Sequence, residues 1–238
     1  MSDQGEKQKE TIIKLLTEKS VMKQNVFANT ISVFNLLKDC LKDKAEELGN
    51  SINKIDKRVN VNYKDVNLQG AQLKVAGDLL ELNMHTNVFE FERSHPMFKT
   101  SYIKESAYNS YCGIINVYNF LADSYKYNRY NDLGFLIARI FINREKKFFV
   151  ETRTQIGYKY SSFSEEEINK DIINDILNEL IIYAISFDLH TPPFDAVRQV
   201  TVMEMQEKSN SSVLRTGKRL GYAGTEGSNN RFDDEIDL

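Results

Sequence analysis

The sequence predicts an α+β fold, and three observations support this class. A long proline-free segment at the N-terminus has a helical pattern, the middle of the chain contains runs that alternate between apolar and polar residues, and a strongly apolar helical pattern follows them. The chain has 238 residues, of which 41% are hydrophobic, and this is enough to bury a core. We therefore expect a mainly antiparallel sheet covered by a C-terminal amphipathic helix, with a long N-terminal helix or helical hairpin.

The helical segment is residues 6–57, which carry charges of both signs. Its first half is apolar over a wide arc and requires burial on more than one side. Its second half keeps a narrow apolar stripe at 4-3 spacing, typical of a coiled-coil seam or of a helix lying on a domain. We predict that residues 1–60 form an assembly segment, interrupted near Gly49. Its predicted oligomerisation residues are Leu41, Leu48, Ile52 and Ile55.

Residues 61–70 are polar with alternating valines, and this pattern predicts a linker or an edge strand. A core domain over residues 71–207 follows. Residues 80–84 and 88–92 alternate in polarity as two strands do, and Pro96 ends the second because proline cannot donate to a ladder. Residues 113–121 form the next candidate strand, although a helix there remains open.

Residues 131–157 predict a β-hairpin with a charged turn. Both of its strands are apolar on both faces, and this pattern is typical of the centre of a covered sheet. The next helix is expected from Ser164, which forms a capping box with Glu167, and isoleucines repeat every four residues after it. A last strand is predicted at Val197–Met205. Residues 208–238 are rich in Ser, Asn and Gly, and we predict a disordered tail there.

This order of elements, with a hairpin that ends in Glu151-Thr152-Arg153, resembles the core of the PD-(D/E)xK restriction-endonuclease-like family. The resemblance implies a divergent metal-dependent nuclease in which Glu151 and an Asp hold a divalent cation. Arg153 stands at the position of the family's Lys, but an arginine stays charged and cannot act as a base. Asp132 is the candidate second acid, and it precedes its strand instead of lying within it.

Two histidines suggest a different chemistry. His85 and His95 bracket a segment with two glutamates and Arg93, and a carboxylate beside two imidazoles is a possible metal set. In a regular strand, however, residues ten apart are separated by about 33 Å. A pocket around His85 and Arg93 would make the protein a small-ligand sensor. The spacing of the histidines is not a ligand signature, and we expect no metal. No Gly-rich phosphate loop is present, and we expect no cofactor. The two cysteines, Cys40 and Cys112, are expected to be buried apolar groups.

Residues 124–130 interleave tyrosines with Lys and Arg. Such a segment can anchor a protein partner or stack bases, or it is an ordinary loop whose tyrosines cover the core. The net charge of −3 does not indicate nucleic acid. The predicted partner-binding residues are Tyr125, Tyr127, Arg129, Tyr130, Phe89 and Phe98.

These patterns together favour a non-catalytic interaction or assembly protein that acts as a component of a larger complex. We expect a homo-oligomer with other protein subunits, set in a phage particle or a bacterial defence system. The N-terminus lacks the apolar core of a signal peptide, and no apolar run has the length of a membrane span. The expected location is therefore the cytoplasm, or a particle assembled there. The nuclease and the small-ligand sensor remain the two alternatives.

Overall fold

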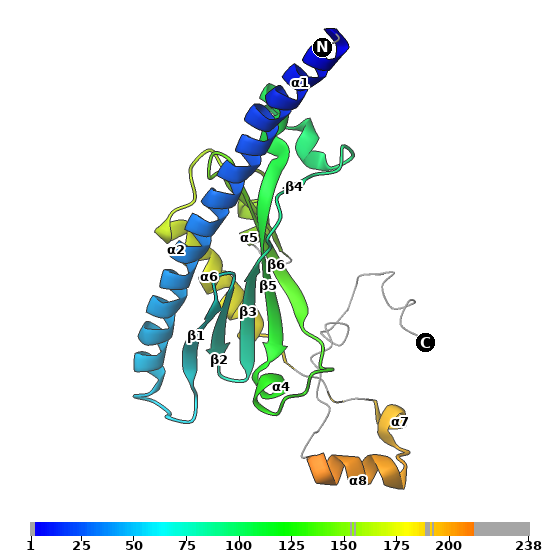
Figure 1. Ribbon diagram of the computed structural model, residues 1–238. Coiled ribbons are helices and arrows are strands. Elements are labelled where there is room, and N and C mark those ends of the chain that lie inside the picture. Colours follow the sequence, from blue (N-terminus) through cyan, green and yellow to red (C-terminus); the bar gives the residue numbers. More distant parts are fainter. Residues whose placement is uncertain (1–2, 153, 155, 189–190, 192, 212–238) are drawn as a thin grey trace.

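The computed structural model describes residues 3–211 apart from 153, 155, 189, 190 and 192 (Figure 1). It contains a long N-terminal helix and a seven-stranded sheet in which all pairings are antiparallel. The predicted α+β class is confirmed.

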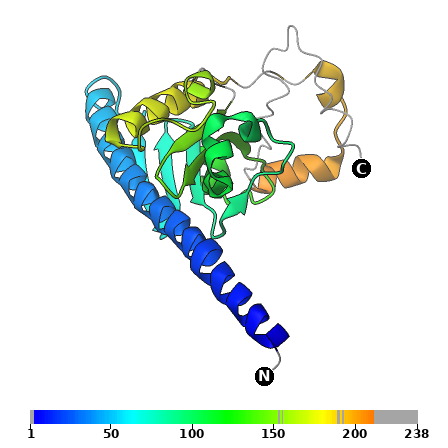
Figure 2. The same ribbon diagram turned by 90° about the horizontal axis from the view of Figure 1, so that it is seen from above.

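The N-terminal helical segment forms one continuous rod and not a hairpin. It consists of α1 (Asp3–Leu15), a π-helical stretch η1 (Leu16–Ser20) and α2 (Val21–Ile52). The predicted break at Gly49 does not occur, because the helix continues to Ile52. Figures 1 and 2 show α2 lying along the sheet, while α1 projects past it.

The sheet has the order β1-β2-β3-β5-β6-β7, and β4 pairs with β5. Of the two alternatives for residues 61–70, the structure has the edge strand. The strands are β1 (Val61–Asn67), β2 (Gly70–Val75), β3 (Asp78–Met84), β4 (Phe89–Glu90), β5 (Tyr111–Leu121), β6 (Phe135–Asn143) and β7 (Phe148–Thr152). Short helical turns join the strands: η2 (Pro96–Lys99), α3 (Ser101–Glu105), η3 (Ala107–Ser110) and α4 (Ala122–Lys126). A further turn, α5 (Ile156–Lys159), follows β7.

The predicted hairpin is β6–β7, but its position in the sheet was predicted wrongly. It lies at one edge, with β7 outermost, and not at the centre. Its two strands are apolar on both faces because, in the half of the hairpin near its turn, a different hydrophobic cluster covers each face. Phe148 and Val150 join the main core, whereas Phe141 and Phe149 join a second cluster built on Met97 and Ile103. The rings of Phe141 and Phe149 stack with centroids 4.4 Å apart.

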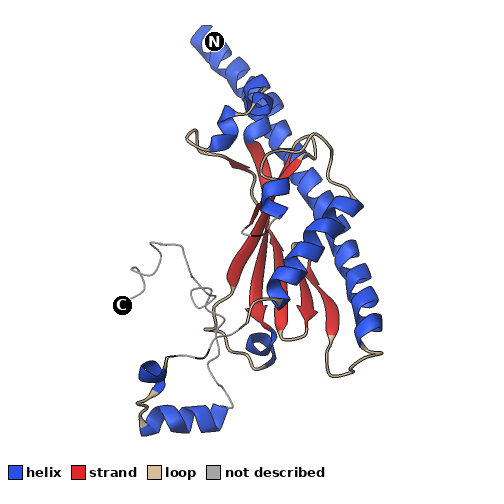
Figure 3. Cartoon of the chain, turned by 180° about the vertical axis from the view of Figure 1, so that it is seen from behind, coloured by secondary structure: helices blue, strands red, loops and turns tan. Residues whose placement is uncertain are grey.

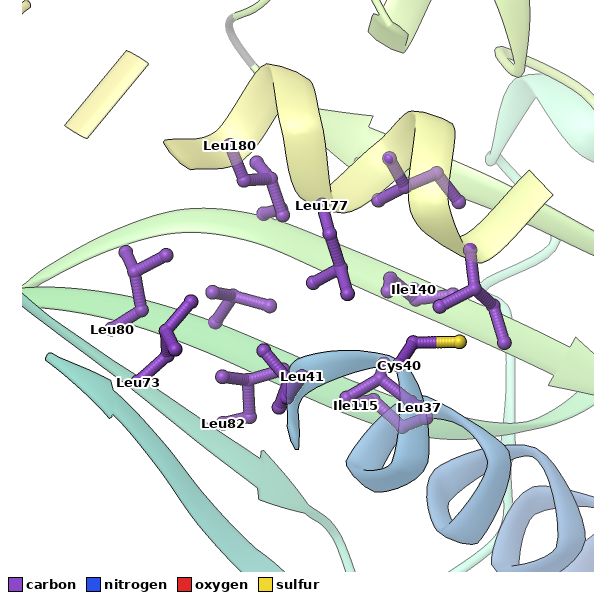
Figure 4. Close-up of a cluster of buried hydrophobic side chains, with 14 of the residues drawn as sticks. Leu37, Cys40, Leu41, Leu73, Leu80, Leu82, Ile115, Ile140, Leu177 and Leu180 are labelled. Atoms are coloured by element: carbon purple, nitrogen blue, oxygen red, sulfur yellow. The ribbon is translucent and has the colours of Figure 1, made fainter. Parts of the chain in front are cut away.

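The main core lies between one face of the sheet and two helices, α2 and α6 (Lys170–Ile185), which Figure 3 shows against the sheet. In Figure 4 the side chains of these helices point toward those of the strands. Residues shown there with less than 2% exposure include Leu37, Cys40, Leu41, Leu82, Ile115, Ile140, Leu177 and Leu180. Burying each leucine contributes about 1.5–3 kcal/mol to the free energy of unfolding.

Of the two alternatives for the narrow apolar stripe, a coiled-coil seam and a helix lying on a domain, the structure has the second. Leu41 is fully buried in the main core, and Leu48 packs against that core. The helix ends at Ile52, and Ile55 lies beyond that end with 82% of its surface exposed. The stripe therefore does not require a second helix, and residues 1–60 and 71–207 do not form separate packing units, because α2 shares one core with the sheet.

The helix and the sheet approach most closely at Gly113 of β5. A Cβ at this position would lie 2.1 Å from Thr30 Oγ1 and 2.8 Å from both carbon atoms of that side chain. Thr30 is fully buried on α2, and its hydroxyl donates to the Val26 carbonyl at 2.7 Å. Gly113 therefore allows α2 to pack directly on the backbone of a strand.

The capping box predicted at Ser164 is wrong. Helix α6 begins at Lys170, and its N-cap is Asn169, whose side chain accepts a hydrogen bond from Ile172 N at 3.0 Å. Ser164 instead extends the pairing of β7, because its backbone N–H donates to the Phe148 carbonyl at 2.8 Å. The apolar period after residue 168 was predicted correctly, but it contains no information on where the helix starts.

The strand predicted at Val197–Met205 is also wrong. The segment contains α7 (Phe194–Val197) and α8 (Val202–Ser211). Thr201 and Glu204 form a true capping box: Glu204 N donates to Thr201 Oγ1 at 3.1 Å, and Thr201 N donates to Glu204 Oε2 at 2.7 Å. Of the predicted tail, residues 208–211 belong to α8, and residues 212–238 lie outside the described residues.

Candidate functional site

The tyrosine-rich loop between β5 and β6 surrounds a cavity of about 300 Å³. The loop follows directly from the end of β5, includes α4, and returns to the sheet at Gly134. The cavity is lined by Phe120, Ser124, Tyr125, Asn128, Arg129, Tyr130 and Asp132. It thus combines aromatic walls with a few polar groups, as small-molecule sites do.

An ion pair holds the loop from within. Arg129 Nε lies 2.9 Å from Asp132 Oδ2, and the two side chains are only 5% and 11% exposed. Ser124 Oγ donates to the same oxygen at 2.6 Å, and Arg129 N donates to the Ser124 carbonyl at 2.8 Å. Such a buried pair adds little net stability, but removing one partner leaves the other charge buried and unpaired, which is strongly destabilising. The pair therefore fixes one loop conformation.

Phe120 forms a wall of the cavity, and a glycine holds its ring in place. A Cβ at Gly134 would lie 2.2 Å from two atoms of this ring, so the ring packs directly on the glycine backbone. Tyr125 meets the ring edge-on, with centroids 5.4 Å apart. Asn128 adopts a left-handed φ of 51°, which asparagine tolerates better than most residues. The aromatic wall and the turn are therefore both preset.

Tyr125 connects the loop to the sheet. Its hydroxyl donates to Glu81 Oε2 at 3.3 Å, and Gln72 Nε2 donates to the same oxygen at 2.5 Å. Burial raises the pKa of Tyr125 to about 12, and the neighbouring carboxylate of Glu81 adds to this rise. Burial also raises the pKa of Glu81, although the hydrogen bonds from Gln72 and Tyr125 oppose the rise. Tyr125 therefore stays protonated, and its hydroxyl acts as a donor.

The structure brings three of the predicted partner-binding residues to this cavity: Tyr125, Arg129 and Tyr130. Tyr127 is not in its lining, and Lys126 Nζ lies 4.7 Å from the Tyr127 ring centroid. Phe89 lies on β4, on a different part of the sheet, and Phe98 packs partly buried against the second cluster. The six residues therefore do not form one surface.

The two acids of the proposed nuclease centre have different partners. Glu151 accepts from Arg139 Nε at 2.6 Å, directly across the β6–β7 pair. Asp132 belongs to the cavity loop, and it lies six residues before Ala138, which pairs with Thr152. Asp132 pairs with Arg129 in that loop, whereas Glu151 pairs with Arg139 on the hairpin, so each carboxylate has its own arginine. Arg153 lies outside the described residues.

The histidines of the alternative metal or ligand site have local roles. His85 Nδ1 accepts from Asn87 N at 3.0 Å, and His95 Nδ1 accepts from Met97 N at 3.3 Å. Arg93 stacks over Phe98 at 4.9 Å. Among the described residues, no group of three or more His, Cys, Asp or Glu side chains is arranged to hold a metal ion.

Both cysteines are free and buried, as expected from the sequence. Burial raises the pKa of Cys112 to about 12 and also raises the pKa of Cys40. Because the thiolate is the reactive form, neither side chain is placed to act as a nucleophile.

A second candidate site is the projecting part of the N-terminal helix, which was not singled out from the sequence. Four apolar side chains in two turns stand open to solvent: Ile12 (57% exposed), Ile13 (49%), Leu15 (54%) and Leu16 (56%). The run of apolar residues after a charged stretch was visible in the sequence. What the sequence could not show is that the sheet ends before this part of the helix.

Comparisons of the chain with protein-family models, with curated proteins and with solved structures found no match. Within the described residues, no helix combines the length and the apolar character that crossing a bilayer requires.

Proposed function

We propose that the protein is a non-catalytic assembly component that associates with a second copy of itself through its projecting N-terminal helix. The observation that carries this proposal is the exposure of Ile12, Ile13, Leu15 and Leu16 on a helix that extends past its own sheet. We name these four residues the apolar tip. A contiguous exposed apolar group of this kind marks an interaction surface.

The length of the helix supports an interaction role. An isolated helix as short as α1 is only marginally stable in water, because its first turn is costly to form. Here α1 continues the helix that includes α2, so that first turn is already formed. The protein therefore holds an apolar helical face in solution without covering it. An amphipathic helix presented in this way is suited to pairing with another helix or to entering a groove.

The charge distribution favours a second copy in antiparallel orientation as the occupant. Residues 3–10 carry a net charge of −1, and residues 11–23 carry +2. An antiparallel pair places the acidic part of each helix beside the basic part of the other. If the pair crosses between Ile13 and Lys14, the apolar tips meet each other, and residues 3–10 of each helix lie beside residues 17–24 of the other.

The expected affinity is modest. Each half-exposed side chain of the apolar tip contributes about 1 kcal/mol when it is buried, so the eight side chains of the two tips together contribute roughly 8 kcal/mol. Association costs at least about 4 kcal/mol, and the net free energy is therefore about −4 kcal/mol, or a Kd of about 1 mM. Such a contact becomes stable when other subunits hold the two copies together. We propose that this larger complex forms in the cytoplasm, or in a particle assembled there.

Sedimentation equilibrium on the full chain tests the proposal. Between about 10 and 500 µM, the average mass should rise from that of one 27.5 kDa chain toward that of two. The variant Ile12→Gln/Leu16→Gln should stay monomeric, because it removes the apolar contact without shortening the helix. Leu68→Gln is the matched control, since Leu68 is 87% exposed on the β1–β2 turn. A wild-type chain that is monomeric throughout, or equal association of the double variant, would refute the proposal.

A further inference from the structure

We propose that the cavity of the tyrosine-rich loop binds a small, uncharged, planar heteroaromatic molecule, such as a nucleobase or a nucleoside. This ligand site is independent of the self-association of the N-terminal helix. It follows from the size of the cavity, its aromatic walls, its charge and the rigidity of its loop.

The size of the cavity limits the ligand. Its volume of about 300 Å³ is at the lower end of the range found for ligand sites. It therefore accommodates one ring system with a small substituent, and a dinucleotide or a peptide segment would not be enclosed.

The walls select a flat molecule. Phe120 and Tyr125 provide two aromatic rings at nearly right angles, with an interplanar angle of 86°. Tyr130 also lines the cavity, and 89% of its surface is exposed, so its ring can cover a bound molecule. A planar ring can stack on one of these faces and present its edge to another. An aliphatic molecule of the same volume would gain only apolar contact.

The charge of the lining selects a neutral molecule. Arg129 and Asp132 are the charged residues of the lining, and they pair with each other. An anion or a cation entering the cavity would have to compete with that buried pair. The amide of Asn128 can donate to or accept from a heterocycle, and the Ser124 hydroxyl, which donates its own proton to Asp132, can accept from a ring N–H. The lining has no surplus of positive charge for a phosphate backbone.

The loop is organised before any ligand binds. The Arg129–Asp132 pair, the hydrogen bond from Ser124 and the packing of Phe120 on Gly134 fix the polar side and one aromatic wall. Tyr125 is fixed through Glu81 of the sheet. Because these groups need little ordering, most of the stacking free energy remains available for binding.

Titration calorimetry and ligand-observed NMR on the full chain test this proposal with adenosine, guanosine and indole. Cyclohexanol serves as the non-planar control, and adenosine 5′-monophosphate as the charged one. We expect a Kd below about 1 mM for at least one planar compound, no measurable binding of cyclohexanol, and no gain in affinity from the phosphate.

Two matched variants locate the site. Tyr130→Ala should weaken binding by about fivefold or more, which is the loss expected for one stacking partner. Tyr158→Ala should leave binding unchanged, because Tyr158 is 86% exposed on α5 and does not line the cavity. Both residues are exposed, so neither change threatens the fold. Failure of all planar compounds to bind at 5 mM (about five times the expected limit of 1 mM), equal losses in both variants, or tighter binding of the monophosphate would overturn the proposal.

Discussion

Replacing Gly113 by Ala should destabilise the protein far more than a single methyl group suggests. The new Cβ would lie 2.1 Å from Thr30 Oγ1, about 1.3 Å short of the 3.4 Å at which ordinary contact begins. Rotating the Thr30 side chain moves Oγ1 and Cγ2 but does not remove the clash, because Thr30 Cβ stays in place at 2.8 Å. The whole of α2 must therefore move away from β5.

The magnitude follows from two opposing effects. Overpacking in a core costs about 1–3 kcal/mol. An alanine in a strand recovers about 0.5–1 kcal/mol, because its backbone loses less conformational entropy on folding than that of glycine. Because α2 must move as a whole, the upper end of the overpacking cost applies, about 3 kcal/mol, and we expect a net loss of about 2 kcal/mol in the free energy of unfolding, measured by urea denaturation followed by circular dichroism. Gly77→Ala is the matched control, because a Cβ at Gly77 has no atom within 4 Å and its loss should be small.

A double-mutant cycle assigns the loss to its cause. Thr30→Ala removes two of the three clashing atoms, so Gly113→Ala should cost about 1 kcal/mol less in that background. If Gly113→Ala is as stable as the wild type, or if the two changes are simply additive, α2 does not pack on β5 as described.

The other predictions concern a carboxylate, the thiols and a helix cap. Burial raises the pKa of Glu81 in the native state above the ordinary 4.5, so stability falls as the pH rises from the unfolded pKa through the native one. Glu81→Gln should therefore gain stability relative to wild type with increasing pH between 4 and 7 (about the window of a perturbed carboxyl). A constant difference in urea midpoints between the two proteins would contradict this. Cys40 and Cys112 should react with a thiol reagent such as Ellman's only after unfolding. Rapid labelling of the native protein at pH 8 (about the pKa of a free thiol) would show that they are not buried. Asn169→Ala should cost about 1 kcal/mol in thermal or urea unfolding, whereas a loss confined to Ser164→Ala would restore the earlier helix start.

Local patterns were enough to predict most of the elements of this fold. The alternation in β3 and the apolar period of α6 depend on neighbouring residues and on one face of one element, so the sequence contains them directly. The position of β6–β7 at the sheet edge could not be predicted in this way. Phe149 is buried in one cluster with Met97 and Ile103, which are distant from it in the chain. A strand pattern that is apolar on both faces does not indicate which residues cover each face.

The candidate site shows the same limit. The aromatic and basic composition of residues 124–130 indicated a recognition loop, but Asp132 was assigned to a metal site on its position before a strand. Its pairing with Arg129 depends on the turn at Asn128, and the bond from Tyr125 to Glu81 joins residues 44 positions apart. The capping box of α8 was readable at Thr201 and Glu204, yet the valines and methionines around it favoured a strand.

The most direct test of the proposed assembly is a distance measurement between spin labels at Gln4→Cys in the full chain at high concentration. Gln4 is exposed near the start of α1, and both native cysteines are buried and should stay unlabelled. An antiparallel pair that crosses between Ile13 and Lys14 separates the two labels by about 30 Å, from a rise of 1.5 Å per residue. A distance near 30 Å that disappears in the Ile12→Gln/Leu16→Gln background is the predicted result. A distance below about 20 Å would indicate a parallel pair, and the absence of any dipolar coupling would show that the projecting helix does not bind a second copy.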